Sequence, residues 1–236
     1  MNKIYGIAIC FFLSYNILAQ TRVKPIEYRF KNGERGLLDF LTERVIYPKV
    51  SQVTGSIGFS ISGISISPAG KVDNIKIINP IDELIDNEVI SLLRSSAKLW
   101  LKCDTISHNQ TFFIQIAFVI SGSSLKVSVT SPVSYRFFIE PVTITAPNSI
   151  KEVAFVPQSD ELMAIKCIVL VSSQRYNEAL DLINGLIKRN PFKKELYQYR
   201  ITIYKNINRQ DLIEDDVQKL TNFADGFSLE EILNKY

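Results

Sequence analysis

The chain has 236 residues, of which 46% are apolar and 22% are charged, and its formal net charge is +3. This length suits one large or two modest domains, and the apolar content is enough to bury their cores. The lysines and arginines are scattered, and no array of basic and aromatic residues is present. Nucleic acid is therefore not an expected partner.

The N-terminus has the pattern of a secretory signal peptide. Lys3 is followed by the almost wholly apolar run 4–15, and Ala19 offers a small residue for cleavage before Gln20. The apolar run is shorter than the ~20 residues of a membrane-spanning helix. We expect residues 1–19 to be removed, which leaves a periplasmic or secreted protein; an uncleaved inner-membrane anchor is the alternative. The Leu-Ala-Gln ending resembles that of exported Bacteroidetes proteins.

Two segments, 58–67 and 71–78, are predicted to form a β-hairpin. In the first, apolar residues alternate with serines, as in a half-buried strand. The parity of the apolar residues changes near Gly63, which indicates a bulge. A Pro-Ala-Gly turn that ends at Gly70 joins the two segments, and an Asn-Pro pair closes the second.

A helix and a third strand follow the hairpin. Apolar residues recur at three and four positions from Leu84 to Ala97, while Asp82 near the start and Lys98 near the end complement the helix dipole. Residues 111–119 are predicted to form the next strand. The order is therefore β-β-α-β.

An ordered set of residues between 47 and 100 resembles the C-terminal domain of the TonB family of energy transducers. The matching positions are a Tyr-Pro pair, a glycine before the first strand, the turn pattern Pro-x-Gly-[Lys/Arg]-Val and a tryptophan that ends the helix: Tyr47, Pro48, Gly58, Gly70, Val72 and Trp100. The resemblance covers about residues 30–122. The family commonly has a proline and a glycine soon after the tryptophan, whereas this chain has Leu-Lys-Cys-Asp, so the loop 104–110 is expected to be built differently.

The resemblance implies a protein-binding module linked to TonB-dependent transport. In that family the domain adds a short segment of an outer-membrane receptor to the edge of its sheet. The corresponding partner-binding residues would be those of the last strand: Phe113, Gln115, Ile116, Ala117 and Val119. The alternative is that residues 125–144 pair with or cover this strand. Domains of the family can also pair through their strands, which would give a homodimer.

The remainder of the chain is predicted to contain a β-rich connector, residues 123–158, and a helical domain, residues 159–236. Prolines interrupt the short β-type runs of the connector. The first helix is predicted to be apolar and to contain Leu162, Ile165, Cys167, Ile168 and Leu170. In the second, from Tyr176, the spacing around Ala179 resembles a tetratricopeptide repeat. A generic helical hairpin packed on the first domain is the alternative. A capping box at 228–231 predicts a last short helix.

No arrangement of residues indicates catalysis. The acids near Asp82 and those from Asp211 to Asp216 are interpreted as solvated helix starts. His108 lies in a polar loop, and Cys103 and Cys167 are interpreted as small buried residues, with a disulfide as the alternative. The sequence contains no phosphate-binding loop, dinucleotide fingerprint or nucleophile elbow. We therefore expect that the protein is not an enzyme, and that it has no catalytic residues, no cofactor and no metal site.

The sequence thus predicts an α+β chain with a signal peptide (1–19), a TonB C-terminal-like domain (20–122), a connector (123–158) and a helical hairpin domain (159–236). Its expected function is non-enzymatic protein interaction in the periplasm. A scaffold or assembly adaptor of the cell envelope, which uses the helical domain, is the alternative function.

Overall fold

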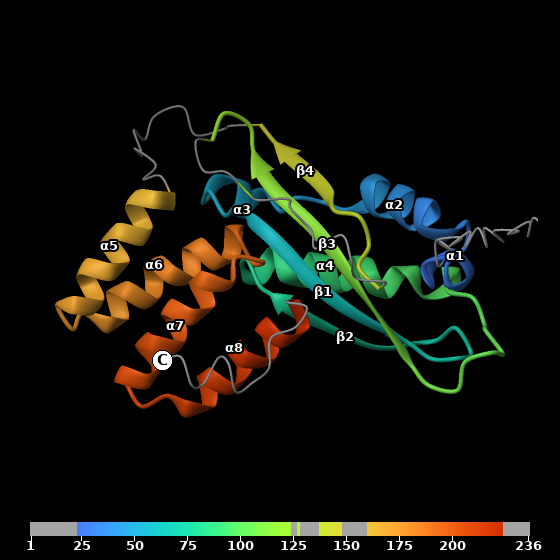
Figure 1. Cartoon of the computed structure of the whole chain (residues 1–236). Helices are drawn as coiled ribbons and strands as arrows, with labels where there is room; N and C mark the ends of the chain where they lie inside the picture. Colours follow the sequence, from blue (N-terminus) through green and yellow to red (C-terminus); the bar gives the residue numbers. More distant parts are fainter. Residues whose placement is uncertain (1–22, 124–126, 128–136, 148–159, 224–236) are drawn as a thin grey trace, which may run out of the picture.

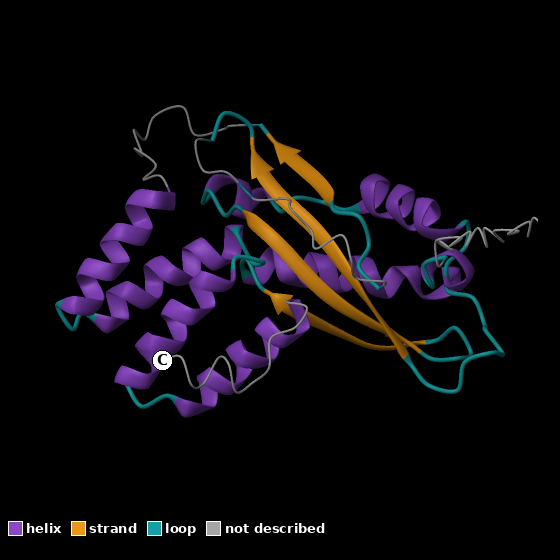
Figure 2. Cartoon of the chain, viewed as in Figure 1, coloured by secondary structure: helices purple, strands orange, loops and turns teal. Residues whose placement is uncertain are grey.

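The computed structural model describes residues 23–123, 127, 137–147 and 160–223, with 221–223 described only as helix. The expected signal peptide and the capping box at 228–231 lie outside these residues. A four-stranded sheet runs diagonally through the molecule, with helices of the N-terminal half on one side and a helical unit near the start of β1 (Figures 1 and 2).

The described elements include the β-β-α-β unit and the C-terminal helices that the sequence predicts, and three further helices that it does not, α1 to α3. Their bounds are α1 (Ile26–Arg29), α2 (Gly33–Arg44), α3 (Lys49–Val53), β1 (Gly58–Ile66), β2 (Val72–Asn79), α4 (Glu83–Ser95), the 3₁₀ helix η1 (Ser96–Leu99), β3 (Gln110–Ile120), β4 (Val142–Ala146), α5 (Asp160–Ser172), α6 (Tyr176–Arg189), α7 (Lys194–Asn206) and α8 (Gln210–Phe223). The β-β-α-β order is confirmed by β1, β2, α4 and β3, and the fold is mixed α+β.

The strand order is β2-β1-β3-β4. β1 pairs antiparallel with both β2 and β3, and β4 pairs parallel with β3 from Ile116–Val142 to Ile120–Ala146. An isolated bridge joins Phe113 to Phe138. Part of the predicted connector therefore belongs to the sheet, because it supplies the fourth strand.

A bulge is predicted near Gly63, and a register shift does occur next to it, between Ile61 and Ser62, but β1 itself pairs with β3 in continuous register through Gly63. The register shifts occur between β1 and β2, where the extra residue lies on β2: Asp73 in one case and Ile78 in the other. The change of parity in β1 has a different cause. The strand contributes apolar side chains first to one face of the sheet and then to the opposite face.

The larger core lies between the sheet and helices α2 and α4. Ile64 and Ile66 of β1, Val89 of α4 and Leu41 of α2 are all 0% exposed in this core. Asp82 caps α4, since its carboxylate accepts the Ile85 N–H at 2.8 Å.

The opposite face of the sheet carries a smaller core, which joins it to the helical unit. Phe59 and Ile61 of β1 pack there with Phe138 and with Phe192 from the loop between α6 and α7. The Phe59 and Phe192 rings are 5.9 Å apart and meet edge to face. The Asn79 side chain donates to the Phe59 carbonyl at 2.7 Å and is 3.3 Å from the carbonyl oxygen of Lys188 in α6.

The helical unit consists of α5 to α8, in which each helix packs on the next. Ala179 of α6 is 0% exposed, and its carbonyl accepts the Cys167 thiol of α5 at 3.6 Å. The apolar helix predicted from Leu162 to Leu170 forms as α5, but Leu162, Ile165 and Ile168 are 51%, 59% and 48% exposed. Among the described elements, α6 is the main packing partner of α5, and part of the apolar surface of α5 stays exposed. The tetratricopeptide-like geometry stays a prediction.

Within the described residues, none of the helices combines the length and the apolar composition needed to cross a bilayer.

Gly70 offers a test of the hairpin turn. Its φ is +78°, and a Cβ at this position would lie 2.8 Å from the Trp100 carbonyl oxygen. We expect Gly70→Ala to lower the free energy of unfolding by about 2–4 kcal/mol, since it combines backbone strain with a backbone collision. Urea unfolding measures this change.

Gly55 is the matched control, because its φ is +72° and nothing lies within 4 Å of an added Cβ. Gly55→Ala should cost only the conformational strain of about 1 kcal/mol. Equal losses in the two variants would contradict the close approach of the turn to Trp100.

Candidate interaction sites

The positions of the family motif hold the sheet and its hairpin together. Tyr47 donates its hydroxyl to the Ser56 carbonyl, and its ring meets the Phe118 ring edge on at 5.2 Å. Burial, followed by the charge of Asp82, raises the pKa of Tyr47 to about 12. Trp100 is 6% exposed and donates Nε1–H to Ser96 Oγ at 2.9 Å. These aromatic side chains stabilise the core and do not line an open surface.

Gly58 allows the helical unit to approach the sheet. A Cβ at this position would lie 2.9 Å from Ile81 Cγ1 and 3.0 Å from the Lys188 carbonyl oxygen of α6. Val72 starts β2 and packs partly buried against the larger core, and Pro48 precedes α3 directly. The structural role of Gly58 involves α6, which lies outside the segment that carries the family resemblance.

The predicted partner-binding residues lie together on β3, but the edge expected there is not free. Gln115, Ile116 and Ala117 are at most 1% exposed, and the Phe113 ring stacks on Phe138 at 4.6 Å. Val119 pairs with Thr145 of β4. The expectation of a free edge at Phe113–Val119 is therefore wrong, and the alternative holds: residues of 125–144, continued to 146, pair beside this strand. The physical reason is that β3 is apolar on both faces and is stable only as an inner strand.

The outer strands of the described sheet are β2 and β4, and they differ in charge. β2 exposes Asp73, Asn74 and Lys76. β4 exposes Thr143 and Thr145, which are β-branched and uncharged. Charged side chains on an edge strand hinder the addition of another strand, whereas β-branched residues favour extended pairing. The β4 edge is thus the better platform for an incoming strand.

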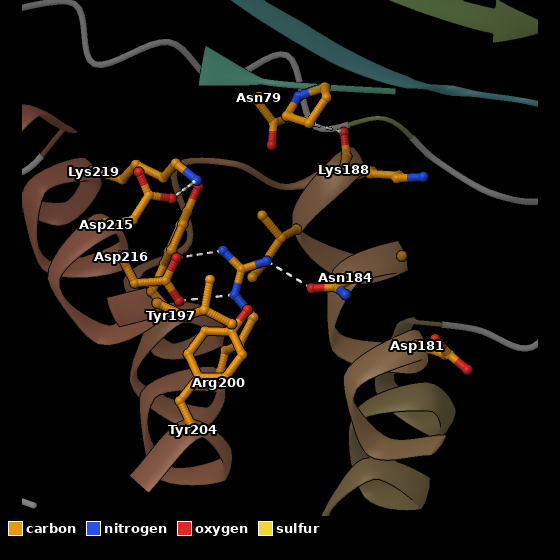
Figure 3. Close-up of a pocket in the computed structure, with 14 residues that line it drawn as sticks. Asn79, Asp181, Asn184, Lys188, Tyr197, Arg200, Tyr204, Asp215, Asp216 and Lys219 are labelled. Carbon is orange, nitrogen blue, oxygen red and sulfur yellow. Dashed lines mark hydrogen bonds and ion pairs between the residues drawn. The ribbon is translucent and has the colours of Figure 1, made fainter. Parts of the chain in front are cut away.

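A polar pocket of about 470 Å³ lies where the end of β2 meets helices α6, α7 and α8 (Figure 3). Arg200 of α7 is held at its wall by Asp216 of α8, with Nε–Oδ2 at 2.8 Å and Nη2–Oδ1 at 2.5 Å, and by Asn184 of α6 at 2.7 Å. The Tyr197 and Tyr204 rings flank the guanidinium at 5.5 and 5.8 Å.

The charges in this pocket neutralise one another. Burial opposes the charged form of Arg200, but the bond to Asp216 outweighs it and raises the pKa of the guanidinium. At the rim, Lys219 pairs with Asp215 at 2.6 Å. The side chain of Asp181 points away from Arg200 (Figure 3). The bonds of Arg200 to Asn184 and Asp216 tie α6, α7 and α8 together.

The sequence interpretation of Asp216 as part of a solvated helix start is wrong, since it is 1% exposed. Val217 and Leu220 of the same helix are also buried. Their positions in the sequence do not indicate that the acid beside them is buried too. The burial of Asp216 is explained by its bonds to Arg200 on the neighbouring helix, and this contact depends on the tertiary fold.

An apolar groove of about 480 Å³ runs between α5 and α7. Its lining residues are Ile168, Val171, Ser172, Glu195, Gln198, Tyr199 and Thr202. It continues the exposed apolar residues of α5, which include Val169 at 56% exposure. Contiguous exposed apolar residues of this kind are typical of a surface that contacts another molecule.

The remaining candidate residues lie apart from these sites. His108 is exposed in the loop before β3, as expected. Cys103 and Cys167 are free thiols, and only Cys167 is buried, so the interpretation of both as buried residues is half right. No group of three or more metal-ligating side chains occurs in the part of the chain that the structure describes.

No protein-family model matches the chain, and no curated protein sequence matches it. Two solved structures are similar to it, both NMR solution structures of the Helicobacter pylori TonB C-terminal domain. The one of residues 194–285 is 21% identical, covers 35% of this chain and 88% of that chain, and has a TM-score of 0.30. The one of residues 179–285 is 20% identical, covers 47% of this chain and 97% of that chain, and has a TM-score of 0.32.

The buried ion pair of Arg200 and Asp216 is expected to contribute more to stability than an exposed ion pair. Asp216→Asn leaves the Arg200 guanidinium buried without its carboxylate, so we expect a loss of about 3–5 kcal/mol in the free energy of unfolding. The exposed pair of Arg209 with Asp211, at 2.7 Å, is the control. Asp211→Asn should cost less than about 1 kcal/mol. Urea unfolding of both variants checks this, and similar losses would contradict the buried role of Asp216.

Asp82 predicts a dependence of stability on pH. Burial opposes its ionisation, but bonds from the Ile85 N–H and from the hydroxyls of Ser56 and Ser51 outweigh it, so the pKa is lowered. The stabilisation is therefore present above the unfolded pKa of ~3.9 and is lost as the pH falls through the folded pKa. We expect Asp82→Ala to cost about 1 kcal/mol at neutral pH and less at about pH 3.

Asp82→Asn is the control for charge, because it keeps a capping oxygen. Urea unfolding at both pH values gives the free energy of unfolding of the wild type, Asp82→Ala and Asp82→Asn. A cost of Asp82→Ala that is the same at both would contradict the role of the ionised cap.

Proposed function

We propose that this chain is a protein-interaction module of the cell envelope, which captures an extended segment of a partner protein as an added strand of its sheet. The observation that carries the proposal is the β4 edge. It is the outer edge of the described sheet on the β3 side, and it exposes Thr143 and Thr145 without a charge. Backbone groups at such an edge can pair with any extended segment. Contacts with the side chains at alternate positions of that segment determine which sequence binds.

The partner strand is proposed to lie beside β4 rather than beside β3. Direct pairing along Phe113–Val119 would require β4 to leave, which would expose Val142 and Ala146, now 7% and 3% exposed. It would also separate the stacked rings of Phe113 and Phe138. In this proposal Phe113, Gln115, Ile116, Ala117 and Val119 support β4 and contact the partner only through it.

The sequence supports one class of partner. The ordered motif from Tyr47 to Trp100 resembles the TonB C-terminal domain, which supports a segment of an outer-membrane receptor as the partner and a role in TonB-dependent transport. The signal-peptide pattern of residues 1–19 supports export to the periplasm. Pairing of two copies through their β4 edges would give a homodimer instead.

A second function is favoured by the helical unit. The exposed apolar residues of α5 and the groove between α5 and α7 form a surface on elements other than β4, and it is more apolar than the β4 edge. In this alternative the chain is an assembly or scaffold adaptor of the envelope, and the helical unit is what binds.

Site-specific photocrosslinking in the native host separates these functions. A photoreactive residue is placed at Thr143 on the β4 edge, at Asn74 on the β2 edge or at Ile165 on α5, all of which are exposed. We expect the Thr143 position to crosslink to one segment of an outer-membrane protein, at a yield at least about tenfold above that of Asn74, because charged edges resist pairing. Mass spectrometry of the crosslinked peptides identifies the segment.

A charge variant provides an independent check. Replacing Thr143 and Thr145 together by lysine should remove the crosslink from a neighbouring β4 position, while Asn74→Lys should leave it unchanged. Circular dichroism confirms that both variants remain folded. Crosslinks that come only from Ile165 would contradict strand capture and favour the scaffold function; crosslinks from Thr143 to a second copy would assign the edge to a homodimer.

A further inference from the structure

Helix α5 lies at the outer end of the helical unit and leaves a large apolar surface exposed (Figure 1). Its buried residues, Cys167 and Leu170, belong to the core of the helical unit, in which α5 packs mainly on α6. Four more of its apolar side chains stay about half exposed: Leu162, Ile165, Ile168 and Val169. A helix that is apolar on most of its sides is normally buried, so we expect this surface to be covered in solution.

Three of the exposed residues form a row along α5. Leu162, Ile165 and Val169 are separated by three and then four residues, which is the spacing of the a and d positions in a pair of packed helices. The row therefore extends over two turns of the helix. It can pack against an equal row on a second helix, because each apolar side chain then enters the gap between side chains of the opposite row.

Two exposed residues of opposite charge border this row. Glu161 directly precedes Leu162 and Lys166 directly follows Ile165, so they occupy the g and e positions on opposite sides of the row. When two copies of α5 lie parallel, Glu161 of one copy faces Lys166 of the other, and the two-fold axis repeats this contact. In an antiparallel pair the two acidic sides would meet instead. One helix thus supplies both halves of a complementary interface.

The groove between α5 and α7 enlarges the apolar surface on the side of Glu161. Ile168, seven residues after Glu161 and therefore on the same side of α5, lines one wall, and Tyr199, 46% exposed, lines the other. Glu195 also lines the groove, so a second carboxylate lies on the side that Lys166 of the second copy approaches. The apolar patch is on the order of 500 Å² per copy, and two copies would bury about 1,000 Å², the lower limit of a specific interface.

We propose that two copies of this chain associate through α5. The two helices lie parallel, with Leu162, Ile165 and Val169 in contact with the same residues of the second copy, and Glu161 pairs with Lys166 across the interface. An interface of this kind has to be complementary to itself, and the position of one acid and one base on opposite sides of an apolar row meets that condition. Strand capture does not depend on this contact, because the residues lie on α5 and not on β4.

The test is the mass of the purified mature chain in solution, measured by sedimentation velocity at concentrations from about 1 to about 100 µM. We expect a dimer. Ile165→Glu should raise its dissociation constant at least about hundredfold, because two like charges would then meet inside the apolar row.

Ile46→Glu is the matched control, because Ile46 is 63% exposed in the loop between α2 and α3, and Ile165 is 59% exposed. The same substitution at Ile46 should leave the dissociation constant unchanged. Circular dichroism establishes that both variants are folded.

Charge reversal tests the orientation of the two helices at exposed polar positions, where folding is little affected. Glu161→Lys and Lys166→Glu each place like charges opposite one another, so each should raise the dissociation constant at least about tenfold. The double variant restores opposite charges, and its dissociation constant should return to within about threefold of the wild-type value.

The proposal is overturned by any of three results. A chain that stays monomeric at about 100 µM would show that another segment of the chain or an unrelated protein covers α5. A dimer that tolerates Ile165→Glu would place the contact elsewhere, such as the β4 edge. A double charge variant that associates no more tightly than the single ones would exclude the parallel pairing of Glu161 with Lys166.

Discussion

The structure depends on the burial of both faces of β1. Phe59 and Ile61 on one face and Ile64 and Ile66 on the other are all 0% exposed. An inner strand of this kind requires a layer on each side. Helix α4 and its neighbours supply one layer, and the Phe192 loop between α6 and α7 supplies part of the other. Since burial of one such side chain stabilises by about 1.5–3 kcal/mol, the helical unit and the sheet stabilise each other where they meet.

This two-sided burial also determines which surfaces remain for a partner. The second face of the sheet carries Phe138 and Phe192 near the start of β1, and β3 is enclosed by β1 and β4. What remains in the described part are the two edges of the sheet and the outer side of the helical unit. Of the edges, β2 presents charges and β4 presents threonines. In the polar pocket between β2 and the helices, the Arg200 guanidinium already binds the Asp216 carboxylate and the Asn184 amide oxygen. The proposed function therefore uses an edge of the sheet and not a cavity.

Local features of this fold could be predicted from the sequence, whereas long-range ones could not. The hairpin turn at Gly70, the start of α4 near Asp82 and the start of α6 at Tyr176 follow from residue chemistry over a few positions, and they are confirmed. The pairing of β4 with β3 could not be predicted, because short β-type runs between prolines fit an edge strand and a connector equally well. The burial of Asp216 likewise depends on Arg200, which is sixteen positions away on another helix. The residues predicted to bind a partner do lie together on one strand, β3. The outermost strand, however, is β4, and it belongs to a segment that the family pattern does not include.

Amide hydrogen exchange of the purified complex tests the central claim most directly. Exchange is measured for residues 142–146 of β4 and 72–79 of β2, with and without the receptor segment that crosslinking identifies. The account predicts that protection is gained at β4 when the segment is bound, since an added strand bonds the outer backbone groups of that strand, and that β2 is unchanged. Protection gained at β2 or at α5, with none at β4, would contradict it.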